Sequence, residues 1–273
     1  MSEEQQAPVG INPHVPNGAR IYDAMLGGKD NFAADRGVVE QMLKANPMAP
    51  LTAKANREFL GRAVRYLTTE CGIDQFLDIG TGLPTVQNVH EVALAHNPKA
   101  RIVYVDYDPI VVTHARALLR GADRVEVVQG DIREPEQILS DASDTLDFDR
   151  PVGVLMVAIL HFVSDAEHPE QILAKLREAM APGSYLIISH TADESSSSVM
   201  GTAKQGFSMA GAPLTPRTRA AIGDLLSGFE LVEPGLVDVR EWRPDALPEP
   251  EVGGGTAIPD LPWTIVGGVG ARA

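Results

Sequence analysis

The sequence has few of the features that mark secreted, membrane-embedded or disulfide-stabilised proteins. Its 273 residues include a single cysteine, Cys71, so the chain cannot form an internal disulfide. Residues 1–6 lack the basic and apolar segments of a signal peptide. The longest apolar run, residues 152–160, is far shorter than the roughly 20 residues of a membrane-spanning helix. These absences predict a cytoplasmic protein with no membrane partner.

Positive charge is also scarce. The chain has 23 Lys and Arg against 37 Asp and Glu, which gives a formal net charge of −14. Such a surface repels nucleic acids and anionic membranes, so we expect no nucleic-acid partner. Hydrophobic residues make up 44% of the chain and charged residues 22%, as in ordinary globular proteins. This composition excludes disorder of the whole chain.

Three segments of different character follow one another. Residues 1–16 contain three prolines and almost no apolar periodicity, which predicts a disordered tail. Residues 17–72 repeat apolar residues every three or four positions, which predicts an N-terminal cap of several helices. Residues 73–273 form the main domain. Within it, residues 192–213 are small and polar without a clear period, so we expect a long loop that acts as a lid.

The main domain alternates strand and helix patterns. Strands are expected at residues 76–79, 102–105, 125–128, 152–158 and 185–189, with two closing strands at 230–239 and 263–269. The last helix is expected to begin with Thr215 as its N-cap and to end at Gly228. This alternation predicts an α/β fold in which helices cover a mostly parallel sheet.

Acidic residues and glycines gather where three successive strands end. The first strand ends in Asp78 and leads into a loop with two glycines, Gly80 and Gly82. The second strand ends at Asp106 and the third just before Asp131. Because ligands of open α/β sheets bind at the carboxyl ends of the strands, these residues predict a nucleoside site. Asp106 stands where a carboxylate accepts hydrogen bonds from ribose hydroxyls.

Two cofactors compete for such a site, a dinucleotide such as NAD and S-adenosylmethionine. The NAD fingerprint needs a third small residue, and this loop has Thr85 there. A carboxylate at Asp78 would repel a pyrophosphate but attract the ammonium group of a methionine moiety. The loop therefore favours S-adenosylmethionine, and an NAD-dependent oxidoreductase is the weaker alternative.

The sequence resembles the class I S-adenosylmethionine-dependent methyltransferases. The resemblance rests on five segments in the family's order: Leu77-Asp78-Ile79-Gly80-Thr81-Gly82, Val105-Asp106-Tyr107-Asp108-Pro109, Gly130-Asp131-Ile132, Ile159-Leu160-His161-Phe162 and residues 176–186. More narrowly, the segments Asn17-Gly18-Ala19-Arg20-Ile21-Tyr22-Asp23, Leu26-Gly27-Gly28-Lys29-Asp30-Asn31-Phe32 and Asn56-Arg57 resemble an uncharacterised, mainly actinobacterial methyltransferase family.

The resemblance implies a Rossmann-like, seven-stranded sheet whose last strand is antiparallel. It implies a backbone cradle at Gly80, Thr81 and Gly82, a ribose acceptor at Asp106 and an acceptor for the adenine amino group at Asp131. Tyr107 and Ile132 would then flank the base. One position departs from the family pattern, because class I loops often have a third glycine where this sequence has Pro84.

Two histidines and the cap supply the candidates for catalysis and substrate contact. His161 and His190 follow the fourth and fifth strands and are candidate general bases near neutral pH. In the cap, we expect Tyr22 and Lys29 to contact cofactor or substrate. The acceptor is expected to be a small molecule bound between the cap and the lid. A non-catalytic S-adenosylmethionine-binding sensor is the alternative.

No metal site is expected. The seven histidines are scattered, and no two of them lie four residues apart on one helix.

Overall fold

The computed structural model describes residues 12–84, 87–194, 197–245 and 263–273. Residues 1–11 of the predicted tail, Thr85 and most of the connection before the last strand lie outside the described residues. No described helix is long and apolar enough to span a membrane.

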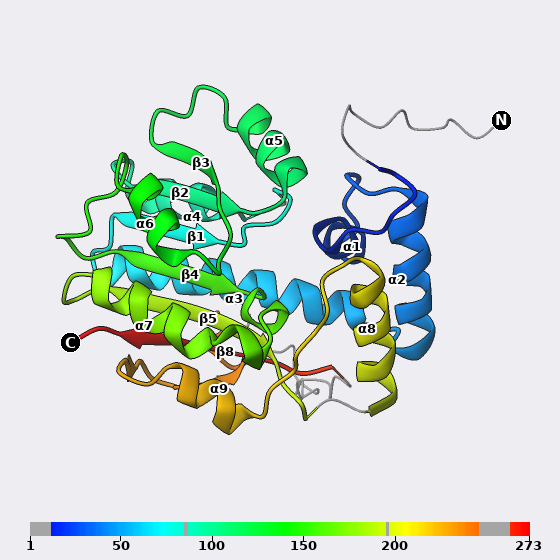
Figure 1. Ribbon diagram of the computed structural model, residues 1–273. Helices are drawn as coiled ribbons and strands as arrows, with labels where there is room; N and C mark the ends of the chain where they lie inside the picture. Colours follow the sequence, from blue (N-terminus) through cyan, green and yellow to red (C-terminus); the bar gives the residue numbers. More distant parts are fainter. Residues whose placement is uncertain (1–11, 85–86, 195–196, 246–262) are drawn as a thin grey trace, which may run out of the picture.

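A single sheet organises the chain (Figure 1). Its strands are β1 (Gln75–Ile79), β2 (Arg101–Asp106), β3 (Val125–Gln129), β4 (Gly153–Val157), β5 (Tyr185–Thr191), β6 (Glu230–Leu231), β7 (Val237–Asp238) and β8 (Ile265–Ala271). The order is β3-β2-β1-β4-β5-β8-β6, and β7 also pairs with β8. The first five strands are parallel, and β8 is antiparallel to β5, as the methyltransferase resemblance implies.

In the described part of the chain the sheet has eight strands, because one expected strand is split in two. Residues 230–239 form β6 and β7, which pair with different parts of β8. Between them lies a turn with Pro234 and Gly235, and Gly235 has a φ of +89°. Since proline has no backbone N–H to donate, the turn interrupts the ladder.

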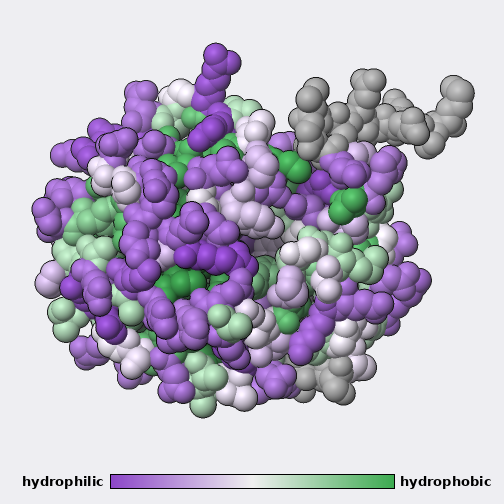
Figure 2. All heavy atoms as spheres, viewed as in Figure 1, coloured by the Kyte–Doolittle hydropathy of each residue, from purple (hydrophilic) through white to green (hydrophobic). Residues whose placement is uncertain are grey.

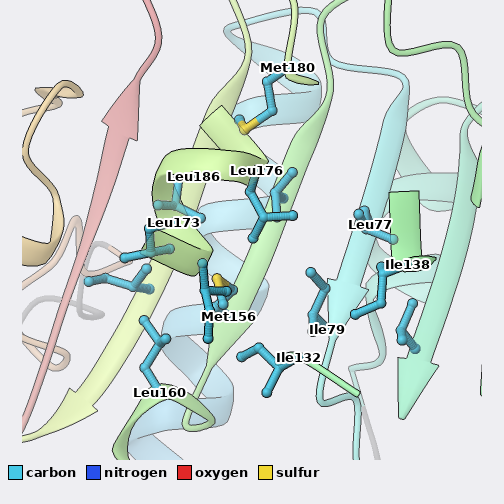
Figure 3. Close-up of a cluster of buried hydrophobic side chains, with 14 of the residues drawn as sticks. Leu77, Ile79, Ile132, Ile138, Met156, Leu160, Leu173, Leu176, Met180 and Leu186 are labelled. Carbon is cyan, nitrogen blue, oxygen red and sulfur yellow. The ribbon is translucent and has the colours of Figure 1, made fainter. Parts of the chain in front are cut away.

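Helices cover both faces of the sheet. They are α1 (Gly18–Met25), α2 (Ala33–Ala45), α3 (Ala49–Thr69), α4 (Val89–His96), α5 (Pro109–Leu118), α6 (Pro135–Ala142), α7 (Pro169–Ala179), α8 (Ser197–Met209) and α9 (Arg219–Leu225), with the 3₁₀ turns η1 (Leu160–Phe162) and η2 (Asp165–Glu167). The core between α6, α7, α9 and the sheet includes Leu77, Ile138, Met156 and Leu173 (Figure 3). The opposite core, under α3, α4 and α5, includes Phe59.

The cap is built from α1, α2, α8 and the first part of α3 (Figure 1). Asn17 caps α1 by accepting a hydrogen bond at Oδ1 from the backbone N of Arg20. The buried Asp35 carboxylate joins α1 to α2, because it accepts hydrogen bonds from the backbone N of Asn17 and from Nε of Arg20. Such a buried charge is stable only because it is paired and hydrogen-bonded.

Helix α8 replaces the loop expected at residues 192–213. Val199, Ala203 and Phe207 recur every four residues and are buried against the rest of the cap. Gly206 allows α2 to approach closely, since a Cβ there would lie 2.8 Å from Cγ1 of Val38. Residues 197–209 of this segment are therefore helical, and their high serine and glycine content hides the helical spacing in the sequence.

The last helix begins later than expected. Thr218 is the N-cap of α9, and its hydroxyl accepts from the backbone N of Ala221. The expected cap, Thr215, donates its backbone N–H to the carbonyl of His161 instead. Residues 213–217 thus lie along the ends of the sheet strands before the helix starts.

Candidate active site

One cavity of about 250 Å³ lies between the carboxyl ends of the parallel strands and the cap. On the strand side it is lined by residues that follow β1, β2, β3 and β4. On the other side it is lined by residues of α1, α3 and α8. The surface is hollowed between these two parts of the molecule, and hydrophilic side chains cover much of the face around the hollow (Figure 2).

The loop after β1 presents its backbone to the cavity. Gly80 and Gly82 have φ angles of +76° and +66°, a region that favours glycine. A Cβ on Gly80 would lie 2.5 Å from Cγ1 of Ile159, so that position has no room for a side chain. A Cβ on Gly82 would have no atom within 4 Å, so open space lies before it. Leu83 lines the cavity beside these glycines.

Asp106 stands at the end of β2 and is nearly buried. Its Oδ2 accepts a hydrogen bond from the backbone N of Gly82 at 2.9 Å, and its Oδ1 accepts one from the backbone N of Asp108 at 3.0 Å. Burial raises the pKa of the Asp106 carboxyl to about 6, although these backbone donors favour its charged form. The residue is thus a fixed acceptor within the cavity.

Asp78 lies behind the glycine loop and is not among the residues that line the cavity. Its Oδ2 accepts a hydrogen bond from Oγ1 of Thr81 at 3.0 Å. Burial raises the pKa of Asp78 to about 6, and the positive charge of Arg57 counteracts this rise. Arg57, from α3, does line the cavity. The positive charge of Arg57 therefore acts on Asp78 at this end of β1.

Asp131, Ile132 and Tyr107 lie together at the ends of β2 and β3, and all three line the cavity. Oδ1 of Asp131 accepts hydrogen bonds from the backbone N of Arg133 at 2.9 Å and from its Nη1 at 3.1 Å. Ile132 is buried, whereas the Tyr107 side chain is exposed. The structure brings these expected nucleoside-site residues together with Asp106.

The cap touches this end of the cavity through one polar contact. Nδ2 of Asn17 donates to Oδ2 of Asp108 at 2.5 Å, while Oδ1 of Asp108 accepts from the backbone N of Ile110 and caps α5. The two ends of this contact belong to the first helix of the cap and to the loop after β2. It closes the cap over the strand ends.

His161 lines the cavity from η1 and is buried. Its Nδ1 accepts a hydrogen bond from the backbone N of Thr191 at 3.4 Å, so the neutral ring carries its proton on Nε2. Burial, together with the nearby His190 and Arg217, lowers the pKa of His161 well below its usual value. None of the described residues forms a hydrogen bond with Nε2 of His161. A neutral imidazole thus faces the cavity.

His190 is buried behind His161 and does not line the cavity. Its ring lies 5.5 Å from the ring of His161, and both of its nitrogens have partners. Nδ1 lies 2.8 Å from the carbonyl oxygen of Thr191, and Nε2 lies 2.9 Å from Nη1 of Arg217. Burial lowers the pKa of His190 to about 4. The structure does not bring this expected base to the cavity.

Arg217 holds the turn that carries His161. Its Nη1 donates to the carbonyl of Leu160 at 3.1 Å, and its Nη2 donates to the carbonyl of Val163 at 2.7 Å. It also forms an ion pair with Asp165 at 2.7 Å. One guanidinium therefore fixes both ends of η1.

Tyr22 lines the cavity, but its hydroxyl already has partners. It donates to the carbonyl of Ala53 at 3.1 Å and accepts from Nδ2 of Asn56 at 3.0 Å. Oδ1 of Asn56 in turn accepts from Oγ of Ser189 at 2.6 Å. Burial raises the pKa of Tyr22, so the phenol is neutral. Lys29 is exposed on the loop after α1 and does not line the cavity.

Among the cap residues near Lys29, Asp23 does line the cavity. Its Oδ2 accepts hydrogen bonds from the backbone N of Asp30 and from Nδ2 of Asn31. A Cβ on Gly28 would lie 1.9 Å from Oδ1 of Asp23, so the loop can fold onto this carboxylate only with glycine there. Hydrogen bonds from Asp30 and Asn31 to Asp23 thus order the loop after α1.

Sequence reasoning missed several polar residues of the cavity, above all Asn17, Asn56, Arg57 and Asp108. One of these residues, Asn56, could be found from a pattern in the sequence. It interrupts the apolar stripe of a helix, three residues after Ala53 and three before Phe59. A buried polar residue within such a stripe needs hydrogen-bond partners.

Part of the cap-side wall of the cavity is apolar. Besides Tyr22, six of its lining residues lie in or against the hydrophobic cluster of the cap: Met25, Ala49, Ala53, Phe162, Phe207 and Trp263. We call these six residues the acceptor chamber. Among the described residues, no group of three or more metal-ligating side chains is placed to hold a metal ion.

Comparisons with known proteins relate the chain to methyltransferases. The sequence model of a family described as S-adenosyl methyltransferase matches residues 4–273. None of the curated proteins compared matches the sequence.

Two similar crystal structures come from actinobacteria. A protein described as a putative methyltransferase from Thermobifida fusca YX is 40% identical, with a TM-score of 0.88, and the match covers 98% of this chain and 99% of that one. A DUF574 family protein from Streptomyces avermitilis MA-4680 is 38% identical, with a TM-score of 0.87, over 95% of this chain and 98% of that one.

A more distant structure shares the fold alone. The mitomycin 7-O-methyltransferase MmcR is 18% identical, with a TM-score of 0.51, over 97% of this chain and 74% of that one.

Proposed function

The chain belongs to the S-adenosyl methyltransferase family, and from this membership we infer that it transfers a methyl group to a small-molecule acceptor in the acceptor chamber. S-adenosylmethionine is its cofactor. The observation that carries the proposal is that one cavity joins the acidic strand ends to an apolar chamber under the cap. A cofactor and an acceptor therefore have adjacent places in the same enclosed space.

The residues at the strand ends fit the nucleoside half of S-adenosylmethionine. The space before Gly82 admits a ligand against the backbone. A carboxylate offers about four acceptor positions, and the backbone occupies only part of those on Asp106, so capacity for ribose hydroxyls remains. We assign the adenine amino group to Asp131, with Tyr107 and Ile132 beside the base. Their common place in the cavity supports this assignment.

The other end of the glycine loop fits the methionine half. An α-amino acid group carries one negative and one positive charge, and Arg57 and Asp78 provide the opposite charges. Arg57 lines the cavity and lies close enough to lower the pKa of both Asp78 and Tyr22. We assign the α-carboxylate to Arg57 and the α-ammonium group to the negative field of Asp78 and the loop carbonyls.

When bound, S-adenosylmethionine supplies an electrophilic methyl group. The chain's own contribution is to orient the acceptor and to exclude water, which accounts for a large part of the acceleration in such displacements. The apolar walls of the acceptor chamber exclude water. His161 holds a proton at Nε2 and can donate a hydrogen bond to the acceptor. His190 and Arg217 keep the His161 turn in place.

Calorimetry with S-adenosylhomocysteine tests the cofactor site. We expect the Asp106→Ala variant to bind about 100-fold more weakly than wild type, because each hydrogen bond to a charged group contributes roughly 1.5–3 kcal/mol. Asp144→Ala is the control, since this exposed residue lies next to Thr145, which contacts the start of β2, and does not line the cavity. Equal affinity of the two variants would show that the nucleoside does not bind at Asp106.

A turnover assay then tests transfer itself. The wild-type protein is incubated with S-adenosylmethionine and a panel of small acceptors, and the release of S-adenosylhomocysteine is followed. Release that depends on both the acceptor and Asp106 supports the enzyme. Tight cofactor binding without release, across a panel that spans oxygen, nitrogen, sulfur and carbon nucleophiles, would favour a binding protein over an enzyme.

A further inference from the structure

The walls of the acceptor chamber are rich in aromatic rings. Phe162 and Phe207 lie 5.3 Å apart between ring centroids, with a tilt of 57°. They come from η1 and from α8, two segments that pack together only in the folded cap. Trp263 closes the wall next to the start of β8, and its ring is buried. Aromatic walls of this kind favour offset or edge contacts with a flat ring.

The polar groups around the chamber are already paired with protein. The Tyr22 hydroxyl is held by Ala53 and Asn56. Nε1 of Trp263 donates to Oγ1 of Thr191 at 3.4 Å, and Oγ1 of Thr52 donates to the carbonyl of Trp263 at 3.3 Å. These groups therefore need no ligand, and a ligand that carried many polar groups would find few partners here.

The charged side chains near the acceptor chamber interact with other parts of the protein. The Asp23 carboxylate is bound by the loop after α1, and burial raises its pKa. Arg57 of α3 acts electrostatically on Asp78, and its Nη2 donates to the carbonyl of Gln87 at 3.1 Å. None of the six residues of the acceptor chamber carries a charge. A charged acceptor would lose its hydration here without gaining an ion pair.

Beside the acceptor chamber, one side-chain nitrogen has no hydrogen-bond partner among the described residues. It is Nε2 of His161, whose ring lies 4.5 Å from the ring of Phe162, between centroids. Since Nδ1 accepts from Thr191, Nε2 is a donor. An acceptor molecule thus meets aromatic walls and a single hydrogen-bond donor at their edge.

From this arrangement we propose that the methyl acceptor is a neutral, flat aromatic molecule with an oxygen that accepts a hydrogen bond from His161. The proposal rests on the proposed function, because it takes the acceptor chamber as the place where the acceptor binds. Phe162, Phe207 and Trp263 hold the ring, and the charge-free walls select against carboxylates. His161 fixes the ring's orientation through the oxygen.

Binding of 2-naphthol, measured by calorimetry in the presence of saturating S-adenosylhomocysteine, tests the proposal. We expect 2-naphthol to bind at least tenfold more tightly than 2-naphthoate, which has the same rings but a negative charge. Decahydro-2-naphthol, which has the hydroxyl but no aromatic ring, should also bind more weakly. Equal or tighter binding of the carboxylate would overturn the proposal.

Single substitutions test whether 2-naphthol binds in the acceptor chamber. Phe207→Ala should weaken 2-naphthol binding about tenfold or more. Met209→Ala, which removes an exposed side chain of the same helix, should leave it unchanged. His161→Phe keeps a ring but removes the donor, so it should weaken 2-naphthol and leave naphthalene unaffected. If Phe207→Ala and Met209→Ala bind 2-naphthol equally well, the probe does not occupy the chamber.

Two readouts separate this proposal from the proposed function. Unchanged affinity of Phe207→Ala for S-adenosylhomocysteine shows that the variant is folded and that the cofactor site is intact. Should that variant not fold, Phe207→Leu, which keeps an apolar side chain but removes the ring, gives the same comparison with a smaller change expected. If the wild-type protein did not bind S-adenosylhomocysteine, the proposed function itself would be contradicted. If it bound S-adenosylhomocysteine but did not prefer 2-naphthol to 2-naphthoate, only the proposed acceptor class would be contradicted.

Discussion

At the scale of single residues, the candidate site depends on two buried acids at the strand ends. Asp78 and Asp106 both have pKa values raised to about 6, chiefly by burial. Each is held by donors of the glycine loop, Thr81 for Asp78 and Gly82 for Asp106. The site thus keeps two weak acids ready for a ligand that brings hydrogen-bond donors and positive charge.

These acids make cofactor affinity dependent on pH. Hydroxyl and ammonium donors favour the ionised carboxylates, and protons compete for the same groups. Affinity for S-adenosylhomocysteine should therefore be constant above about pH 7 and fall as the pH drops through 6, by up to about tenfold per pH unit for each group. Calorimetry between pH 5 and 8 measures this profile, and Asp106→Asn should reduce its slope. A profile that stays flat down to pH 5 would contradict the assignment.

Single residues also show where sequence reasoning reaches its limit. The acids at the strand ends were predictable because the ends of parallel strands meet at one edge of a sheet. His161 and His190 look equivalent in the sequence, since each follows a strand. Only the packed structure distinguishes them, because Arg217, 27 residues after His190, occupies Nε2 of that ring.

At the scale of elements, short turns at the strand ends are held by side chains from elsewhere in the sequence. Arg217 precedes α9 and fixes η1, together with the end of β5. The α1 helix is fixed in the same manner by Asp35 of α2. Elements of the site therefore depend on a few buried charged residues for their position.

Replacement of Arg217 by Met should lower the free energy of unfolding by about 3 kcal/mol. The change leaves buried acceptors on Leu160, Val163 and His190 without a donor, and each such loss costs roughly 1–3 kcal/mol. Arg219→Met is the matched control, because Arg219 forms an exposed pair with Glu194 that contributes at most about 1 kcal/mol. Urea denaturation measures both variants. If the free energy of unfolding decreased by a similar small amount in both variants, Arg217 would not hold the turn.

Most elements of the main domain could be predicted from the sequence. The buried strand β4 is a continuous apolar run, β1 is apolar at three of its five positions, and the helices between the strands have a clear period. Helix α8 could not be recognised as easily, since its apolar face packs against α2, which lies far away in the sequence. The split of residues 230–239 into β6 and β7 depends on how each half pairs with β8.

At the scale of the whole molecule, the cavity joins the cap to the main domain. Cap and sheet have separate hydrophobic clusters, and the cavity lies between them. A chain of hydrogen bonds through Tyr22, Asn56 and Ser189 connects α1, α3 and β5. A ligand in the cavity should therefore stabilise both parts at once.

Saturation with S-adenosylhomocysteine should raise the melting temperature. A ligand at 100 times its dissociation constant stabilises the folded state by about 2.7 kcal/mol, which corresponds to roughly 5–10 °C for a chain of this size. Hydrogen exchange should show slower exchange in α1 and α2 as well as in β1 and β2. Asp106→Ala should show neither effect. Protection confined to the sheet would mean that the cap does not contact the ligand.

The contact between Asn17 and Asp108 has a consequence for the order of events in time. Both residues line the cavity, and their hydrogen bond ties the cap to the nucleoside end. We therefore expect a nucleoside to arrive or leave only while this bond is broken. We then expect a burst of product in the first turnover, followed by a slower steady-state rate that is set by product release. Movement of α1, and not methyl transfer, would limit that steady-state rate.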